Sequence, residues 1–184
     1  MKVGSITGIT VKTFMAILDI VTYPNSILDS EAKKVDFPLD QETKDLIKNM
    51  WNTVKDQGIG LAAPQVGVNK QICIIHLDPE LSDKHTKDLD FVMINPRITF
   101  YSQLEQQMIE GCLSFPEQYY EIWRPANIVV EYLDEKGKKK TLKAKDWLSR
   151  VIQHEVDHLN GKLFINMGGN KITQQDIRNK KVVD

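Results

Sequence analysis

The sequence is poor in cysteine and has no excess of charge of either sign. Cys73 and Cys112 are its only cysteines among 184 residues. Two are too few for a disulfide framework, which is consistent with a reducing compartment. The 24 lysines and arginines nearly balance 25 acidic residues and leave a formal net charge of −1. Since this gives no basic footprint for nucleic acid, DNA is not an expected partner.

Membrane-spanning and targeting segments are also lacking. No apolar run approaches the length of a transmembrane helix, and residues 1–14 have no continuous apolar centre of the secretory type. These residues are predicted to be a dispensable N-terminal extension, with Met15 as the natural start. Residues 15–184 suit one domain with a sizeable core. We therefore expect a single-domain cytoplasmic protein with no membrane partner.

One stretch carries clear chemistry, namely His154-Glu155-Val156-Asp157-His158. Residues four apart on a helix lie above one another on the same face, so His154 and His158 can point their imidazoles at one divalent metal. Glu155 is near enough to reach a water held by that metal. The pattern is H-E-x-x-H, which is typical of metal-dependent hydrolases. The alternative is a helix whose histidines satisfy hydrogen bonds in the core.

The flanking residues predict that this motif lies on a buried central helix. Asp146 is expected to cap the start of the helix, and Asn160-Gly161 is expected to end it. Apolar residues occur nearly all round it, at Trp147, Leu148, Val151, Ile152 and Leu159. A helix buried in this way can hold metal ligands rigidly.

Two histidines leave a catalytic metal one short of its usual three protein ligands. Position 164, where an extended pattern has a third histidine, is Phe164, and no glutamate follows His158. Upstream, Cys112 follows a glycine and precedes a proline break, which suits a thiol presented at a turn or at the end of a strand. A Cys-His-His set would leave a fourth position for water. By spacing alone, a buried structural cysteine remains an equal alternative.

A second helix is predicted over residues 41–57, where apolar residues recur with helical period. Asp40 is its expected N-cap, and Gly58 its expected stop. The segment Gly58–Gln65 follows with two glycines, two alanines and a proline. Small residues let a backbone run close to a ligand or metal. A tight connection between helix and strand explains the segment equally well.

Strand-like runs cover residues 71–77, 91–100, 127–133 and 139–142, the last two as a hairpin. Pro96 is expected to weaken pairing in the second run or to place it at a sheet edge. Cys73 is expected to be a small core residue. His76 and His85 are expected to be structural or solvated.

Three segments together resemble the peptide deformylase (polypeptide deformylase) family. The family motifs G-x-G-x-A-A-x-Q, E-G-C-x-S-x-P and H-E-x-x-H followed by L-x-G correspond, in order, to Gly58–Gln65, Glu110–Pro116 and His154–Gly161. Residues 17–24 also resemble the family's N-terminal strand. The expected fold is α+β, with mixed, mostly antiparallel β-sheets surrounding the central metal-binding helix and the helix at 41–57 packed outside.

The resemblance implies a metal-dependent hydrolase that removes the formyl group from the N-terminal formyl-methionine of newly synthesised polypeptides and releases formate. It implies one divalent metal per chain, Fe(II) in the cell, with Zn, Ni or Co also accepted in purified protein. The implied metal ligands are Cys112, His154 and His158. Glu155 would be the general acid and base. Gln65 and the backbone N–H of Leu113 would stabilise the oxyanion.

The resemblance also implies that N-formylmethionyl nascent peptides bind as an added strand, along the backbone of Ile59, Gly60 and Gly111. Trp147 and Val151 share the helix face of the first histidine, so they are expected to line the methionine pocket together with Ile59.

Several residues depart from the family pattern or allow alternatives. Arg150 lies on the pocket side, where an apolar residue is expected, and is predicted to fold outward with only its stem along the pocket. Tyr119-Tyr120 stand at the expected rim and differ from many relatives. Arg124 and Asp157 match a pair that braces the metal site, or else they form a surface ion pair.

Partners and competing functions remain open from the sequence. The resemblance implies that the C-terminal segment 171–184, which has several basic residues, can contact the ribosome. A metallopeptidase that cleaves internal peptide bonds is the alternative enzyme. A catalytically silent homologue is the third hypothesis, and the intact Glu155 argues against it.

Overall fold

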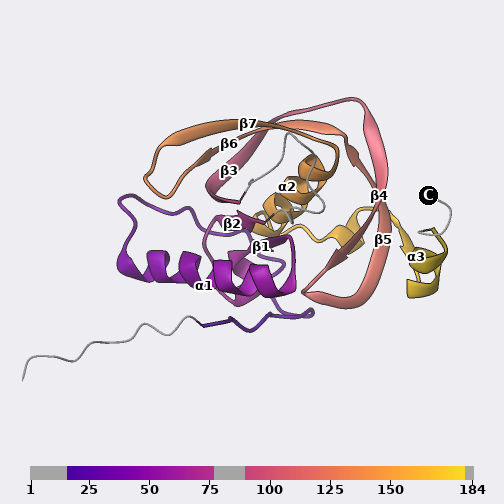
Figure 1. The fold of residues 1–184 in the computed structure, drawn as a ribbon, viewed down its shortest axis with the longest axis horizontal. Helices are drawn as coiled ribbons and strands as arrows, with labels where there is room; N and C mark the ends of the chain where they lie inside the picture. The colour runs from indigo at the N-terminus through magenta and orange to yellow at the C-terminus, as the bar shows by residue number, and fades with distance from the viewer. Residues whose placement is uncertain (1–15, 77–89, 181–184) are drawn as a thin grey trace, which may run out of the picture.

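The computed structural model describes residues 16–76 and 90–180, and Figure 1 shows their arrangement. The predicted extension at residues 1–14 and His85 lie outside the described residues. The fold is α+β, with two antiparallel sheets and few helices, as predicted. In the described ranges, no helix has the length and apolarity needed to cross a membrane.

The larger sheet has five strands in the order β1-β2-β3-β6-β7, and every pair in it is antiparallel. Its strands are β1 (Gly60–Ala62), β2 (Ile72–Ile75), β3 (Phe91–Tyr101), β6 (Asn127–Leu133) and β7 (Lys139–Lys145). The predicted strands and the hairpin are confirmed. Pro96 falls where the β3–β6 register shifts, between Ile94 and Arg97. The expected weakening of pairing at Pro96 is confirmed, while the alternative of an edge strand is wrong, since β3 lies inside the sheet.

The smaller sheet was not predicted, and it supplies the other wall of the molecule. Its order is β4-β5-β8, with β4 (Glu105–Cys112), β5 (Phe115–Pro125) and β8 (Asn170–Ile172). Because β4 and β5 contain many polar residues, the sequence lacks the alternation of apolar and polar residues that would have predicted these strands. Two of these polar residues, Glu110 and Arg124, are buried and face the interior of the molecule.

Helix α1 (Gln41–Gln57) packs outside the larger sheet, with its bounds as predicted. Asp40 accepts a hydrogen bond from the backbone N–H of Thr43 at 2.7 Å and so caps the start of the helix. Ile47, Met50 and Val54 are buried against β1 and β2.

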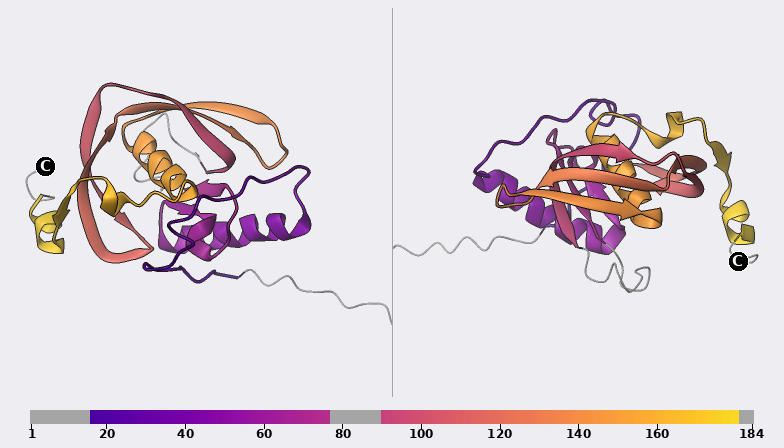
Figure 2. Two further views of the ribbon diagram at one scale, coloured as in Figure 1. Left: turned by 180° about the vertical axis from the view of Figure 1, so that it is seen from behind. Right: turned by 90° about the horizontal axis from the view of Figure 1, so that it is seen from above.

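Helix α2 (Asp146–Leu159) lies between the two sheets, as Figures 1 and 2 show from three sides. Asp146 does not cap it as predicted. Asp146 is instead the first helical residue, at φ 47°, and its carboxylate accepts a hydrogen bond from the Gln106 side chain at 2.8 Å. The helix does end at Asn160-Gly161. Gly161 has φ 65°, and a Cβ there would meet the Asp29 carbonyl oxygen at 2.6 Å.

Three short helices complete the described chain. They are η1 (Ala63–Val66), η2 (Phe164–Asn166) and α3 (Gln174–Lys180). Of these, η1 carries Gln65 and adjoins α2.

Candidate metal centre and substrate cavity

The donor atoms of Cys112, His154 and His158 lie within 4.8 Å of one another. The two histidines come from adjacent turns of α2, and Cys112 ends β4, which brings the two structural layers together at this point. The Cys112 Sγ is 3.3 Å from Nε2 of His158. The structure therefore brings together the three residues that the sequence proposed as ligands.

The atoms around this group have the pattern that a metal and its water would complete. His154 uses Nδ1 to bond Glu110, which leaves Nε2 for a metal. Burial lowers the pKa of His158 well below its usual value, which favours the neutral, ligating imidazole. Glu155 Oε2 is buried with no hydrogen-bond partner among the described residues. A thiolate with two imidazoles suits Zn, Fe, Ni or Co.

Phe164 occupies the place where the extended pattern has a third histidine. Its ring packs against His154, with centroids 5.6 Å apart, and it is almost completely buried. This position supplies an apolar wall and no donor atom, whereas Cys112 places a donor atom beside the two histidines.

Glu155 points toward the same site from α2 and is 4% exposed. A Cβ on Gly60 would lie only 2.3 Å from Glu155 Oε1, so only glycine at position 60 leaves room for the carboxylate. Burial raises the pKa of Glu155 to about 7, while the charge of His154 acts in the opposite direction. A carboxyl group with a pKa near neutrality can both take and return a proton.

Gln65 and Leu113 lie on two sides of the cysteine. The Gln65 side chain accepts from the Ala62 N–H at 2.8 Å through Oε1, which turns its Nε2 toward Cys112 Sγ, 3.4 Å away. Leu113 follows Cys112 directly and lines the adjoining cavity. Both positions are suitable for donating hydrogen bonds to a developing oxyanion.

The extended segment before residue 25 forms backbone hydrogen bonds both to η1, which carries Gln65, and to the turn between β4 and β5. The Val21 N–H donates to the Gln65 carbonyl at 2.8 Å, and the Tyr23 N–H donates to the Ser114 carbonyl at 2.9 Å. The expected strand at residues 17–24 is wrong, since these residues are extended but are not part of a sheet among the described residues. Their backbone holds η1 and the β4–β5 turn in a fixed relation.

A cavity of about 460 Å³ opens beside the metal centre. All five predicted substrate-binding residues line it, namely Ile59, Gly60, Gly111, Trp147 and Val151. Tyr119 is at its rim, where a Cβ on Gly111 would come within 2.9 Å of the tyrosine ring. Tyr120 instead packs edge-on against Phe164, with ring centroids 5.6 Å apart.

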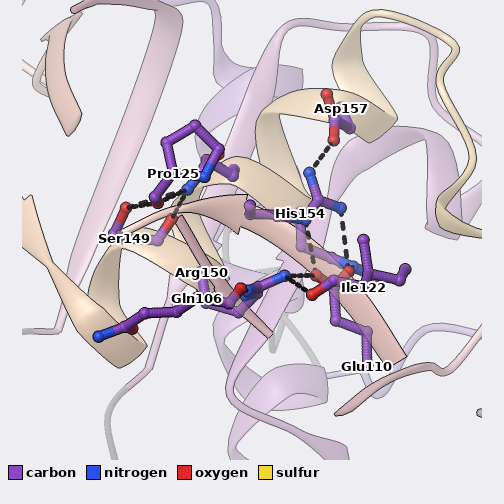
Figure 3. A network of polar contacts seen from close by, with 10 residues as sticks. Gln106, Glu110, Ile122, Pro125, Ser149, Arg150, His154 and Asp157 are labelled. Atoms are coloured by element: carbon purple, nitrogen blue, oxygen red, sulfur yellow. Dashed lines mark hydrogen bonds and ion pairs between the residues drawn. The ribbon is translucent and has the colours of Figure 1, made fainter. Parts of the chain in front are cut away.

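Arg150 does not fold outward as predicted. It is 3% exposed, and its guanidinium donates to Glu110 Oε1 at 2.8 Å and to the Ile122 carbonyl at 3.0 Å (Figure 3). The prediction failed because it compared Arg150 only with its neighbours on the helix. The buried carboxylate that attracts it comes from β4, forty positions earlier in the chain.

Sequence reasoning did not identify Glu110 as part of this site, although it begins one of the three motifs. Its Oε1 accepts from Arg124 Nε at 2.6 Å, and its Oε2 from His154 Nδ1 at 2.9 Å (Figure 3). Burial alone would raise the pKa of Glu110, but the hydrogen bonds from His154 and Arg124 hold that pKa well below its usual value. Its position two residues before Cys112 was the available signal.

Arg124 also pairs with Asp157, and both side chains are largely buried. The alternative of a surface ion pair is therefore wrong. Arg124 links Asp157 on α2 to Glu110 on β4, so this pair connects the metal helix to the smaller sheet.

The chain is similar to known proteins over most of its length. The family model described as polypeptide deformylase matches residues 17–173. The peptide deformylase of Picosynechococcus sp. is 44% identical over 149 residues, which cover 80% of this chain and 77% of that protein. The peptide deformylase of Wolbachia pipientis is 43% identical over 156 residues, which cover 82% and 87%. The solved structure of the Ehrlichia chaffeensis peptide deformylase in complex with actinonin has a TM-score of 0.76 at 37% identity, covering 91% and 96%.

Proposed function

Because the chain belongs to the polypeptide deformylase family, we propose that Cys112, His154 and His158 hold its metal and that Glu155 moves the protons. The protein is a metal-dependent hydrolase that removes the formyl group from the N-terminal formyl-methionine of newly synthesised polypeptides. The observation that supports the site assignment best is the convergence of three donor atoms beside a buried, unpartnered Glu155 oxygen.

Each residue then has a defined task. When bound, the metal would lower the pKa of a water molecule enough for that water to lose a proton near neutral pH and attack the formyl carbon. Glu155 accepts the proton lost in the attack and returns it to the amine nitrogen as the bond between carbon and nitrogen breaks and formate leaves. The Gln65 amide and the Leu113 N–H donate to the formyl oxygen as it gains negative charge.

The two sheet edges at the cavity support strand-like binding of the substrate. Both β1 and β4 are outer strands, so each has one edge with no neighbouring strand within residues 16–76 and 90–180. Backbone groups around Gly60 and Gly111 on these edges hydrogen-bond an extended peptide without reading its side chains. The methionine side chain then enters the apolar cavity beside Trp147 and Val151.

Formate release from formyl-Met-Ala-Ser tests the activity and the cysteine ligand together. Wild-type protein, purified anaerobically with Fe(II), is expected to release formate, and Cys112→Ala is expected to release none. A blocked peptide without a formyl group is the control, since a metallopeptidase would cleave it. A folded, metal-loaded wild type that released no formate would refute the assigned activity.

We also propose that the metal in the cell is Fe(II), with Zn, Ni or Co able to replace it in purified protein. The mixed thiolate and imidazole donors suit all four metals, so the ligands alone do not choose among them. Metal analysis of anaerobically purified protein, beside turnover after reconstitution with each metal, tests this choice. Higher turnover with zinc than with iron would contradict it.

Contact with the ribosome in the cytoplasm is a further proposal. It is supported by the basic residues Lys171, Arg178, Lys180 and Lys181 near the end of the chain and by a substrate that emerges from the ribosome. Deleting residues 171–184 is expected to reduce co-sedimentation with ribosomes, and unchanged co-sedimentation would contradict the contact.

Deleting residues 1–14 is expected to leave turnover intact if residues 15–184 form the whole catalytic domain.

A further inference from the structure

Arg150 is a buried cation at the cavity that has no task in the reaction described above. Its guanidinium spans from α2 to both long strands of the smaller sheet. It donates to the Glu110 carboxylate and the Gln106 carbonyl on β4, and to the Ile122 carbonyl on β5 (Figure 3). Four residues further along α2 is His154, which bonds the other oxygen of the same carboxylate.

We propose that Arg150 is a positioning residue, which holds the Glu110 carboxylate in the orientation that fixes the ring of His154. Glu110 Oε1 accepts from Arg124 Nε at 2.6 Å and from Arg150 at 2.8 Å. Glu110 Oε2 accepts from Arg124 at 2.9 Å and from His154 Nδ1 at 2.9 Å. With two donors on each oxygen, the carboxylate has no other orientation that keeps all four bonds.

The two arginines have different roles, which follow from the contacts that each of them makes. Arg124 grips Glu110 through Nε and a terminal nitrogen and also bonds Asp157. Arg150 bonds one carboxylate oxygen and two backbone carbonyls, which locks the carboxylate to the strands. The two guanidiniums and the two carboxylates of Glu110 and Asp157 also balance in charge, as a buried cluster requires. Groups that orient a metal-ligating histidine tune its affinity for the metal.

The inference rests on the proposed role of His154 as a ligand, so its main readout is metal binding. Arg150→Met keeps the length of the stem but removes the charge and the donors, and Arg150→Lys keeps the charge as a single point. Arg97→Met is the matched control, because Arg97 is exposed and forms its ion pair with Glu131 within the larger sheet. Dissociation constants for Co(II) are measured on metal-free protein by competition with a chelator.

Arg150→Met is expected to bind Co(II) about 10-fold more weakly than wild type. At saturating Co(II), its kcat on formyl-Met-Ala-Ser is expected to fall, while KM changes by less than about 2-fold, since the substrate contacts remain. Arg150→Lys is expected to bind Co(II) more tightly than Arg150→Met but more weakly than wild type. Arg97→Met is expected to bind Co(II) as tightly as wild type. If Arg150→Met fails to fold, Arg150→Lys carries the test, with an expected affinity between those of wild type and Glu110→Gln.

A double-mutant cycle shows whether Arg150 acts through Glu110. In the Glu110→Gln background, adding Arg150→Met is expected to cause no further loss of Co(II) affinity. The same loss in both backgrounds would overturn the proposal, as would wild-type affinity together with a raised KM, which would make Arg150 only a cavity wall. If wild type released no formate but Arg150→Met still weakened Co(II) binding, the assigned reaction would fail and the positioning role would stand.

Discussion

The two long helices of this protein are specified in opposite ways. Helix α1 has a side-chain N-cap at Asp40, and its apolar residues face the larger sheet while its other side is exposed. Helix α2 begins without any side-chain cap, at a residue with φ 47°, and is buried on nearly all sides. It also buries charged groups, including Arg150 and Glu155.

Helix α1 is specified by its own capping and hydrophobic residues, whereas α2 depends on contacts with residues from other parts of the chain. In α1, capping and hydrophobic periodicity agree with each other, which is the ordinary mark of a stable element. In α2, the charges are balanced by residues on β4 and β5, and Glu155 Oε2 and His158 Nδ1 stay without partners among the described residues. The departures from ordinary capping and from the burial of apolar residues therefore occur on the helix that carries the candidate site.

The largest expected effect comes from removing the acid on α2. Glu155→Gln is expected to lower kcat by about 10³-fold, because an amide cannot take the proton from the attacking water. The matched change on α1, Glu42→Gln, alters an exposed acid and is expected to leave kcat unchanged. Formate release measures both, and metal content has to remain at the wild-type level. Turnover retained by Glu155→Gln would remove this residue from the mechanism.

Metal removal is expected to weaken α2 far more than α1. A metal present at 1,000 times its Kd stabilises the folded chain by about 4 kcal/mol, and a chelator removes this contribution. Amide hydrogen exchange should then accelerate first in residues 146–159, whereas residues 41–57 keep most of their protection. Equal acceleration in both helices would show that the metal stabilises the fold as a whole.

In the metal-free protein, the contribution of Glu155 to stability is expected to fall as the pH rises from about 4.5 to 7. Burial raises the pKa of Glu155 to about 7, so its carboxyl stays protonated in the folded state and ionises on unfolding. The unfolded state therefore binds fewer protons in this window, and stability falls with pH by at most about 3 kcal/mol. Urea unfolding at pH 5 and pH 8 measures this loss.

Glu155→Gln is the control for this pH effect, because it has no proton to lose. Its metal-free form is expected to be more stable than metal-free wild type at pH 8, and the gain should shrink toward pH 5. A variant with the same pH dependence as wild type would assign the effect to another group.

The contrast between the helices also explains what the sequence could predict. The bounds of α1 and the presence of β2, β3, β6 and β7 follow from local periodicity and capping, so they were predicted correctly, whereas β1 was not predicted. The convergence of Cys112 with the α2 histidines was predicted only through the family resemblance, since spacing alone left a structural cysteine as an equal alternative. The burial of Arg150 and the hub at Glu110 were missed, because their partners are 40 and 44 residues away in sequence. The prediction that Asp146 caps α2 was wrong, because the Asp146 carboxylate accepts a hydrogen bond from Gln106 on β4 instead.

The smallest expected effect tests whether α1 is as independent of the site as the comparison implies. Asp40→Ala removes the bond to the Thr43 N–H and is expected to lower Tm by about 2–4 °C, whereas Asp40→Asn, which can still cap, should stay near wild type. Neither variant is expected to change kcat on formyl-Met-Ala-Ser. A fall in kcat with Asp40→Ala would mean that the first turn of α1 is coupled to the cavity. Since α1 packs on β1 and β2, and β1 carries Gly60, that coupling would have to pass through the strand that makes room for Glu155.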